Sequence, residues 1–217
     1  MQHKHFRIQN MRKAIAASNR MINFSYRKDW LNPPWYSSYE KNNYGDFFYA
    51  LMRVYQPKKV VELGTKAGYS AFHMARGLTA NGKGKLDCYD LWENYKFNSV
   101  PRSLAEKNLK KYKKIVSLSL RNAIGVDKRY KEIDILHVDL SNEGGILEKI
   151  IPYWIDKVRQ VIILEGGSKE HDKLPWIKKF KKIPVEKWLA DFIRKHPNIE
   201  HVTIEPFPSV TILRKNE

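Results

Sequence analysis

The sequence contains one cysteine, Cys88, among 217 residues. A single thiol excludes a disulfide framework, and it excludes a structural zinc site built on several cysteines. Long hydrophobic runs are also missing, since no stretch approaches the roughly 18–20 apolar residues that span a membrane. The small apolar run at 14–17 is far shorter than the roughly 7–15 residues of a signal-peptide core. We therefore expect a cytoplasmic protein with no membrane association.

Acidic residues are scarce relative to basic ones. The 40 lysines and arginines exceed the 23 acidic residues and leave a net charge of +17, while 42% hydrophobic and 12% aromatic residues suffice for a core and exclude a disordered chain. Such a field attracts nucleic acid, phosphorylated metabolites or acidic surfaces without choosing among them. The lysine clusters at 107–114 and 178–182 fit a solvated face, and alternatively an RNA-binding patch.

Two regions differ in character. Residues 1–45 form a basic and aromatic N-terminal extension, with a basic helix predicted before Pro33 and an aromatic stretch from Trp30 to Tyr44 that packs on the core or serves as a lid. Residues 46–217 alternate regularly between strand-like and helix-like patterns, with no repeat and no Gly/Ser-rich linker. We therefore assign 46–217 to one domain.

This domain is predicted to be an α/β fold with a doubly wound sheet. Strands are expected at 59–63, 85–90, 115–120, 133–140 and 159–165, separated by helices near 45–57, 71–79, 101–113 and 146–154. Strands that are apolar on both faces are typical of a parallel sheet covered on both sides. Two alternating segments, 199–207 and 209–215, predict a terminal antiparallel hairpin. The expected sheet is mostly parallel and seven-stranded, with a reversed edge.

The segment 60–70, VVELGTKAGYS, carries the sharpest chemical signal. A strand leads into Gly64 and Gly68 and then into a helix, so the backbone can turn tightly and a ligand can approach without a Cβ in the way. The segment is not the dinucleotide fingerprint, because Glu62 stands where its first glycine would be. A carboxylate there repels a pyrophosphate and suits a cationic amino-acid ligand.

These residues resemble motif I, E-x-G-x-x-x-G-x-S, of the class I S-adenosylmethionine-dependent methyltransferases. The terminal hairpin is similar to the sixth and seventh strands of the same superfamily, so the resemblance covers residues 45–215. It implies S-adenosylmethionine as the cofactor. The implied cofactor-binding residues are, in motif I, Glu62, Gly64, Thr65, Lys66, Gly68, Tyr69 and Ser70, and beyond it Asp90, Leu91, Trp92, Asn122 and Asp139.

Each position outside motif I has an expected role. The superfamily places an acid at Asp90 that accepts hydrogen bonds from the ribose hydroxyls. Leu91 and Trp92 follow where apolar side chains often pack on adenine, although ordinary core packing explains Trp92 equally well. Asn122 follows the third strand, at a position that often binds the adenine amino group. Asp139 borders both the methionine end of the cofactor and the acceptor.

The candidate catalytic residues are Asp139, Glu165 and His171. Ligands bind beyond the carboxyl ends of parallel strands, where Glu165 should emerge beside Asp139. His171 is the only histidine on a loop expected at this edge, so it is the first candidate for a general base. A surface histidine that opens a helical segment is an equally good interpretation. His137, two residues before Asp139, fits a hydrogen-bonded core residue better.

The resemblance also raises the question of a metal. Many similar O-methyltransferases hold Mg²⁺ through carboxylates after the fourth and fifth strands, and Asp139 and Glu165 could supply two oxygen ligands. A third ligand usually follows directly, but this chain has Gly166 there. We therefore expect no metal.

The favoured function is methyl transfer from S-adenosylmethionine to a small-molecule acceptor, on oxygen and with an acceptor that can be anionic. An RNA methyltransferase using the basic surface is one alternative. Against base N-methylation, DLSN follows the fourth strand where nucleic-acid amino methyltransferases carry a different motif. A non-catalytic cofactor-binding Rossmann-type domain is the second alternative. A homodimer is plausible, and the stretch from Trp30 to Tyr44 could form its surface.

Overall fold

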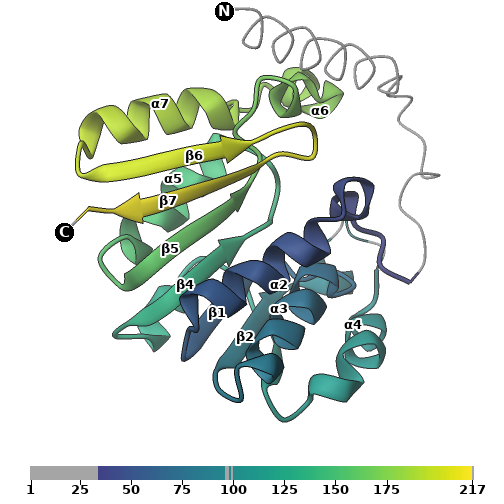
Figure 1. The fold of residues 1–217 in the computed structure, drawn as a ribbon. Helices are drawn as coiled ribbons and strands as arrows, with labels where there is room; N and C mark the ends of the chain where they lie inside the picture. Colours follow the sequence, from purple (N-terminus) through teal and green to yellow (C-terminus); the bar gives the residue numbers. More distant parts are fainter. Residues whose placement is uncertain (1–33, 96–97, 99, 217) are drawn as a thin grey trace, which may run out of the picture. The chain divides into compact units, whose positions relative to one another are not determined.

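The computed structural model describes residues 34–95, 98 and 100–216 (Figure 1). The chain divides into two compact units, residues 1–31 and 32–217, and every described residue belongs to the second unit. The predicted basic helix before Pro33, like Trp30, therefore falls outside the described residues. No helix in the described ranges has both the length and the apolar character needed to cross a membrane.

The domain is built on one seven-stranded sheet. Its strands are β1 (Lys59–Leu63), β2 (Lys85–Asp90), β3 (Val116–Leu120), β4 (Ile133–Val138), β5 (Val158–Glu165), β6 (Ile199–Ile204) and β7 (Val210–Lys215). They lie in the order β3-β2-β1-β4-β5-β7-β6. The first five are parallel, and β7 runs antiparallel to both β5 and β6. The predicted fold class is confirmed.

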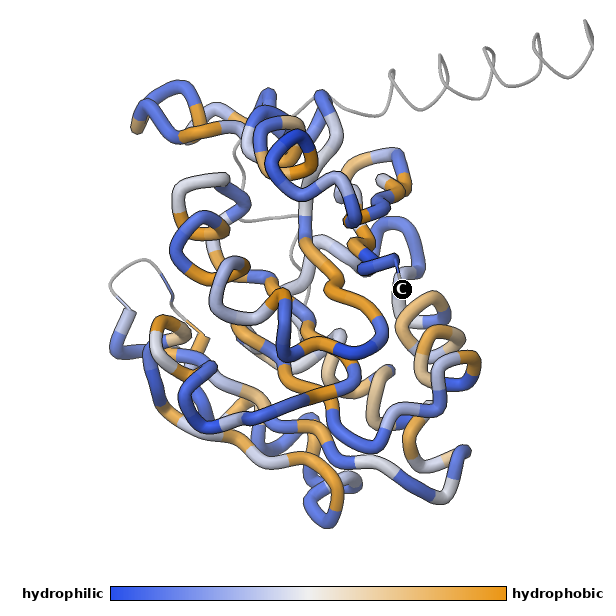
Figure 2. The backbone as a smooth tube through the Cα atoms, turned by 90° about the vertical axis from the view of Figure 1, so that its left-hand side faces the viewer, coloured by the Kyte–Doolittle hydropathy of each residue, from blue (hydrophilic) through white to orange (hydrophobic). Residues whose placement is uncertain are grey.

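Helices cover both faces of the sheet (Figure 1). One face carries α2 (Tyr44–Tyr55), α3 (Tyr69–Ala80) and α4 (Arg102–Leu109), and the other carries α5 (Gly144–Trp154) and α7 (Val185–Lys195). Neighbouring residues of β1 separate the two cores, since Val60 packs with α2 and α3 whereas Val61 packs with α5 and α7. Figure 2 shows the resulting hydrophobic segments running through the middle of the domain.

Two boundaries follow from backbone chemistry. Helix α2 ends where Gln56 adopts a left-handed conformation with φ 46°, directly before Pro57, because proline disfavours a helical conformation in the residue that precedes it. The predicted 101–113 helix is α4 followed by a short 3-10 turn, η4 (Lys110–Tyr112). The short α6 (Pro175–Lys179) contains the first lysines of the cluster at 178–182, which was expected on a helix or its edge, whereas α7 was not among the predicted helices.

An N-terminal segment, residues 34–43, packs with the sheet domain. It contains the 3-10 helix η2 (Ser38–Asn42), whose Tyr39 is 1% exposed and contacts the rings of Phe48 and His137. Asn42 Nδ2 donates hydrogen bonds to the carbonyl oxygens of Pro206 and Phe207, at 3.2 and 3.1 Å, in the turn between β6 and β7. The aromatic stretch therefore lies partly in the core.

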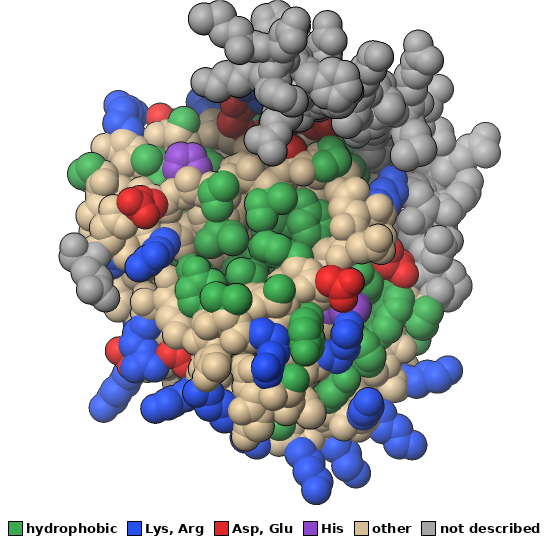
Figure 3. All heavy atoms as spheres, viewed as in Figure 1, with side chains coloured by type: hydrophobic (Ala, Val, Ile, Leu, Met, Phe, Trp, Pro, Cys, Tyr) green, Lys and Arg blue, Asp and Glu red, His purple; other side chains and the backbone are tan. Residues whose placement is uncertain are grey.

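The excess of basic residues is visible at the surface. On the face drawn in Figure 3, lysine and arginine side chains gather along the lower rim. The charge of +17 is therefore at least partly carried by solvated side chains on the domain itself.

Candidate functional site

The loop after β1 is shaped by the close approach of β1 and β4. Gly64 has φ +91°, and a Cβ placed on it would lie 1.8 Å from the carbonyl oxygen of Asp139. Leu63 and Asp139 are also joined by a backbone hydrogen bond of 2.9 Å. Only glycine meets both the backbone conformation and the space at this position. Gly68, with φ +88°, then begins α3.

Asp90, at the end of β2, holds the same loop. Its Oδ2 accepts hydrogen bonds from the backbone N–H groups of Thr65 and Lys66, each at 2.7 Å. Its Oδ1 accepts from the backbone N–H of Trp92 at 2.7 Å. A carboxylate offers about four acceptor positions, so Oδ1 keeps capacity for one more donor. This is compatible with the predicted ribose contact, and it adds a structural role that the sequence did not indicate.

Trp92 supports the loop from within the core. Its ring is fully buried, and its Nε1–H donates to the carbonyl oxygen of Lys66 at 2.8 Å. The guanidinium of Arg102 lies 5.6 Å from the centre of the ring. Because the indole is buried beside the loop, its observed contacts are those of a packing residue.

Asp139 and Glu165 lie together at the carboxyl edge of the sheet, as predicted. Their strands pair in register up to Val138 and Leu164, so the two acids leave neighbouring strand ends. Burial and then the nearby Glu165 carboxylate raise the pKa of Asp139 well above its usual range. Glu165 is 7% exposed and accepts a hydrogen bond from Ser38 Oγ at 2.9 Å. Two adjacent carboxyl groups favour a cationic neighbour or a proton held between them.

Glu62 belongs to a buried polar chain behind this edge. Its Oε1 accepts a hydrogen bond from Ser70 Oγ at 2.5 Å and lies 3.0 Å from His137 Nδ1. The other ring nitrogen, Nε2, is 3.3 Å from the hydroxyl of Tyr39. Glu62 and His137 are both fully buried, which confirms the interpretation of His137 as a core histidine. The chain links motif I to the N-terminal segment.

Lys66 extends from the loop toward the acidic edge. Its Nζ donates to the carbonyl oxygen of Tyr36 at 2.5 Å. Burial lowers the pKa of Lys66, while the charges of Asp139 and Glu165 act in the opposite direction. The N-terminal segment thus contacts the ammonium through Tyr36 and one of the two carboxylates through Ser38, two residues further on.

His171, the first candidate for a general base, is enclosed. It lies in η6 (His171–Lys173) and is fully buried against Phe207, with ring centres 4.7 Å apart. Its Nδ1 lies 3.2 Å from Ser209 Oγ, and its buried Nε2 has no hydrogen-bond partner among the described residues. Burial lowers the pKa of His171 to about 4, so the imidazole is neutral at neutral pH. It is not the surface histidine of the alternative interpretation.

The remaining candidates are distributed around the loop. Tyr69 is 8% exposed, and its hydroxyl accepts from the backbone N–H of Gly45 at 3.1 Å, which ties α3 to α2. Leu91 is partly exposed directly after β2. Asn122 is exposed, and its Oδ1 accepts from the backbone N–H of Ile124 at 2.9 Å in a local turn.

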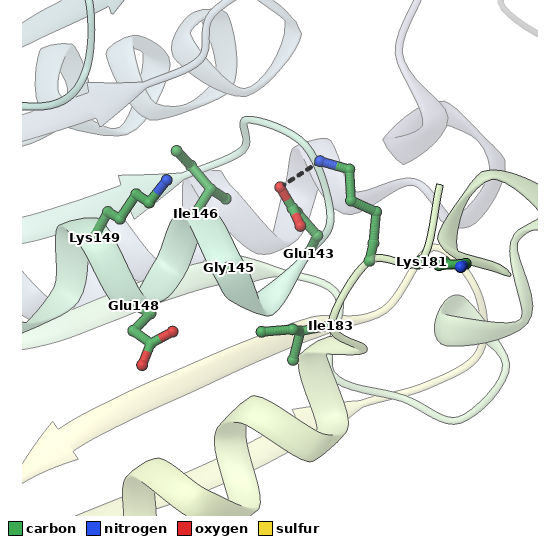
Figure 4. A pocket seen from close by; sticks show the side chains of 8 residues that line it. Glu143, Gly145, Ile146, Glu148, Lys149, Lys181 and Ile183 are labelled. Carbon is green, nitrogen blue, oxygen red and sulfur yellow. Dashed lines mark hydrogen bonds and ion pairs between the residues drawn. The ribbon is translucent and has the colours of Figure 1, made fainter. Parts of the chain in front are cut away.

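Two hollows open beside these residues. One, of about 600 Å³, is lined by Tyr36, Val100, Pro101, Ser103, Leu104 and Lys107. The other, of about 410 Å³, lies between the start of α5 and residues 181–183 (Figure 4). There Lys182 Nζ and Glu143 Oε1 are 2.9 Å apart, and this ion pair crosses the rim of the hollow. Both hollows adjoin elements of the site, whereas the acidic edge itself is covered by the N-terminal segment.

The residues present do not fit a divalent metal. Gly166, with φ +98°, offers no side-chain ligand where a third would be needed. Glu165 already accepts a hydrogen bond from Ser38, and the described ranges hold no group of three or more His, Cys, Asp or Glu side chains that could hold a metal ion. The chain therefore offers only the two carboxyl groups of Asp139 and Glu165, of which the second is already engaged by Ser38 Oγ.

Three residues of the site, Ser38, Tyr39 and Asn108, have partners that the sequence did not indicate. The aromatic stretch was expected on the core or as a lid, but not the hydrogen bond of Ser38 to Glu165 or that of Tyr39 to His137. Asn108 on α4 donates to the carbonyl oxygens of both Pro34 and Ala67, at 3.0 and 2.9 Å, and so joins the segment to the loop. A lone asparagine in a lysine-rich helix gives no signal of this kind.

Comparison with known proteins agrees with this geometry. Residues 61–164 match a family model described as a methyltransferase domain. No curated protein matches the sequence. Among solved structures, the chain resembles the O-methyltransferase TomG of Streptomyces achromogenes, solved with S-adenosylmethionine, with 17% identity, TM-score 0.63 and coverage of 85% of this chain and 83% of that one.

Two further structures show the same likeness. An O-methyltransferase from Bacillus cereus, in complex with S-adenosylhomocysteine, has 16% identity and TM-score 0.63, with 96% of this chain and 90% of that one covered. The methyltransferase PaMTH1 of Podospora anserina, bound to S-adenosylhomocysteine, has 18% identity and TM-score 0.62, with 80% and 78% covered. At such identities the likeness shows the fold.

The strand order, the terminal antiparallel pair and the loop after β1 define a Rossmann-like methyltransferase fold. Residues 61–164, which contain the loop, Asp90 and Asp139, match the model of a methyltransferase domain.

Proposed function

We propose that this protein transfers a methyl group from S-adenosylmethionine to an oxygen of a small-molecule acceptor. The observation that carries the proposal is the joint placement of the Gly64 loop, Asp90 and the pair Asp139 and Glu165 along one edge of a methyltransferase sheet. The O-methyltransferases among the solved structures support oxygen as the acceptor atom. A cytoplasmic location and a homodimer belong to the same proposal.

The residues present fit this cofactor. Gly64 and Gly68 leave the loop without Cβ atoms, Asp90 keeps an acceptor position on Oδ1, and the acidic pair favours a positively charged ligand. When bound, the cofactor supplies a methyl group on a positively charged sulfur, which is already activated for transfer. The chain's own task is to bind, to align the acceptor in line at about 3 Å, and to exclude water.

Each residue then has a defined task. Asp90 holds the loop through the backbone N–H groups of Thr65 and Lys66 and offers its free acceptor position to a ribose hydroxyl. Asp139 and Glu165 balance the positive charge at the reacting end. The N-terminal segment covers this end through Tyr36 and Ser38 and keeps water away. Whether His171 removes a proton stays a prediction, and activity of His171→Gln tests it.

Calorimetric titration with S-adenosylmethionine and S-adenosylhomocysteine, with NAD as the control, tests the proposal. We expect micromolar binding of the first two and none of NAD. Asp90→Asn should weaken binding of both sulfur compounds by about 1–3 kcal/mol, because at least one backbone N–H of the loop then faces an amide N–H₂ or loses its charged acceptor. Binding of NAD alone, or of none of the three, would remove the proposal.

Release of S-adenosylhomocysteine in the presence of candidate acceptors then separates the alternatives. Small hydroxylated and carboxylated aromatic compounds test the favoured function, and short RNA oligonucleotides test the RNA alternative. Methylation of RNA at a rate exceeding every small molecule would overturn the small-molecule assignment.

A further inference from the structure

Lys66 is placed differently from the other residues of its loop. Thr65 and Lys66 both give their backbone N–H groups to Asp90, but the side chain of Lys66 continues past the loop and reaches the carbonyl oxygen of Tyr36. Its backbone has φ 49°, and its carbonyl accepts from Trp92, so the base of the side chain is held on both sides. The ammonium is therefore delivered to a fixed position.

That position is beside the acidic edge. The N-terminal segment contacts the ammonium at Tyr36 and the carboxylate of Glu165 at Ser38, so the two charged groups lie on the same stretch of backbone. Asp139, Glu165 and Asp90 all interact electrostatically with the ammonium. No ion pair within 4.0 Å joins Lys66 to these acids in the described part of the chain, which leaves the ammonium free to face a ligand.

The charges of Lys66, Asp139 and Glu165 favour one class of acceptor. Burial raises the pKa of Asp139, so Lys66 faces a pair that carries less than two negative charges. The methyl donor then brings a further positive charge, which a negatively charged acceptor would balance. Methyl transfer forms the C–O bond from an oxygen lone pair and returns the electrons of the S–C bond to sulfur, so one positive and one negative charge disappear together.

We propose that the Lys66 ammonium is the fixed cation of the acceptor site and holds a negatively charged oxygen of the acceptor beside Asp139 and Glu165, in place of a divalent metal. The inference rests on the proposed function and narrows its substrate class to small molecules that present an oxyanion. Gly166 is consistent with it, because a third metal ligand has no purpose where a lysine supplies the charge.

The relative affinity for S-adenosylmethionine and S-adenosylhomocysteine tests the position of this charge without any acceptor. The two compounds differ by one methyl group and one positive charge. A fixed ammonium nearby therefore weakens the binding of S-adenosylmethionine and not that of S-adenosylhomocysteine. We expect Lys66→Met to raise the affinity for S-adenosylmethionine, relative to that for S-adenosylhomocysteine, by roughly tenfold. This is the size of the repulsion that a like charge several ångströms away exerts at a partly screened site. Lys66→Arg should keep the wild-type ratio, and Lys83→Met, on an exposed turn at the opposite edge, is the matched control.

An oxyanion probe tests the second half of the proposal. Nitrate, substituted for gluconate at constant ionic strength, should raise the affinity of the wild type for S-adenosylmethionine, because an anion between two cations relieves their repulsion. The same substitution should leave Lys66→Met unchanged. We also expect Mn²⁺ binding, measured by electron paramagnetic resonance, to be the same in the wild type and in Glu165→Gln.

The outcomes distinguish this inference from the proposed function. If neither sulfur compound binds the wild type, the proposed function and the role of Lys66 are both overturned. If both bind the wild type and Lys66→Met with an unchanged ratio, only the role of Lys66 is overturned, and the unchanged binding shows that the variant is folded. A nitrate effect that persists in Lys66→Met, or a Mn²⁺ site lost in Glu165→Gln, would equally overturn the inference.

Discussion

At Gly64 the loop after β1 lies directly against the backbone that follows β4. Its missing Cβ allows the carbonyl oxygen of Asp139 to occupy the space beside it, so the first acid of the edge and the loop are positioned by one contact. A side chain here would push Asp139 away from Glu165 as well as distort the loop. Gly64 therefore determines both the conformation of the loop and the position of the Asp139 carboxyl group.

Gly64→Ala should accordingly destabilise the protein and abolish cofactor binding. A Cβ at 1.8 Å from a backbone oxygen forces β1 and β4 apart, at a cost of about 2 kcal/mol or more beyond the strain of φ +91°. Gly125→Ala is the control, because Gly125 has a similar φ of +86° but open space around its Cβ. Urea unfolding of both variants measures the difference. An equal loss of stability in Gly64→Ala and Gly125→Ala would show that the contact between the new Cβ and the carbonyl oxygen of Asp139 is relieved at no cost in free energy.

Asp139 should make the stability of the protein depend on pH. Its pKa is higher in the folded protein than in the unfolded chain, chiefly through burial, so ionising it costs stability as the pH rises above about 4. Asp139→Asn should therefore raise the melting temperature at pH 7, by roughly 2–4 °C for each kcal/mol regained, with little change at pH 3. Thermal unfolding across this range checks it. A lower melting temperature at pH 7 would mean that the ionised carboxylate makes a favourable contact.

At the scale of elements, the N-terminal segment of residues 34–43 joins parts of the chain that are distant in sequence. It touches α4 through Asn108, the loop through Lys66, β5 through Glu165 and the β6–β7 turn through Asn42. Tyr39 anchors it in the core. The cover over the acidic edge is thus held by several separate hydrogen bonds and one buried ring.

Asn42→Ala should loosen this cover locally. The variant loses the hydrogen bonds to the carbonyl oxygens of Pro206 and Phe207, so amide hydrogen exchange should quicken in residues 36–43 and 207–210, by roughly three- to tenfold for about 1 kcal/mol of lost interaction. Exchange in β1 and β4 should not change. Asn198→Ala, at an exposed asparagine, serves as the control. Faster exchange in the central strands would show that the segment supports the whole domain.

The elements also show how far sequence reasoning reached. The strands and the loop after β1 were predictable because apolar runs on both faces and paired glycines leave few alternatives. Helix α7 was not predicted, although Trp188, Leu189 and Phe192 lie on one helical face after Pro184, because its polar face and the lysines before it make the segment hydrophilic on average. The contacts of Ser38 with Glu165 and of Tyr39 with His137 depend on tertiary packing over more than ninety residues of sequence, which no local pattern records.

At the scale of the whole molecule, the net charge of +17 attracts polyanions such as nucleic acid, whatever the catalytic site binds. The charge includes many lysines that lie exposed on the domain, among them those of the 107–114 cluster. Association with nucleic acid through such side chains releases counterions and follows no base sequence. The basic surface therefore does not by itself indicate an RNA substrate.

Binding of single-stranded RNA should be weak, indifferent to sequence and steeply salt-dependent. Between 50 and 200 mM salt the affinity should fall by about a hundredfold or more if several phosphates are contacted. Affinity for S-adenosylmethionine should change far less over the same range. Fluorescence anisotropy with two oligonucleotides of unrelated sequence measures this. A salt-resistant preference for one of them would favour the RNA alternative.

The order of strands has a consequence for synthesis on the ribosome. Within the described part of the chain, β6 is bonded only to β7, and β7 lies between β6 and β5. Strand β6 leaves the ribosome first but cannot join the sheet until the later β7 has emerged and paired with β5. During that interval the edge of β5 is open to other chains. Nascent chains in which β5 has left the exit tunnel while β7 has not should therefore be the ones that chaperones need to protect.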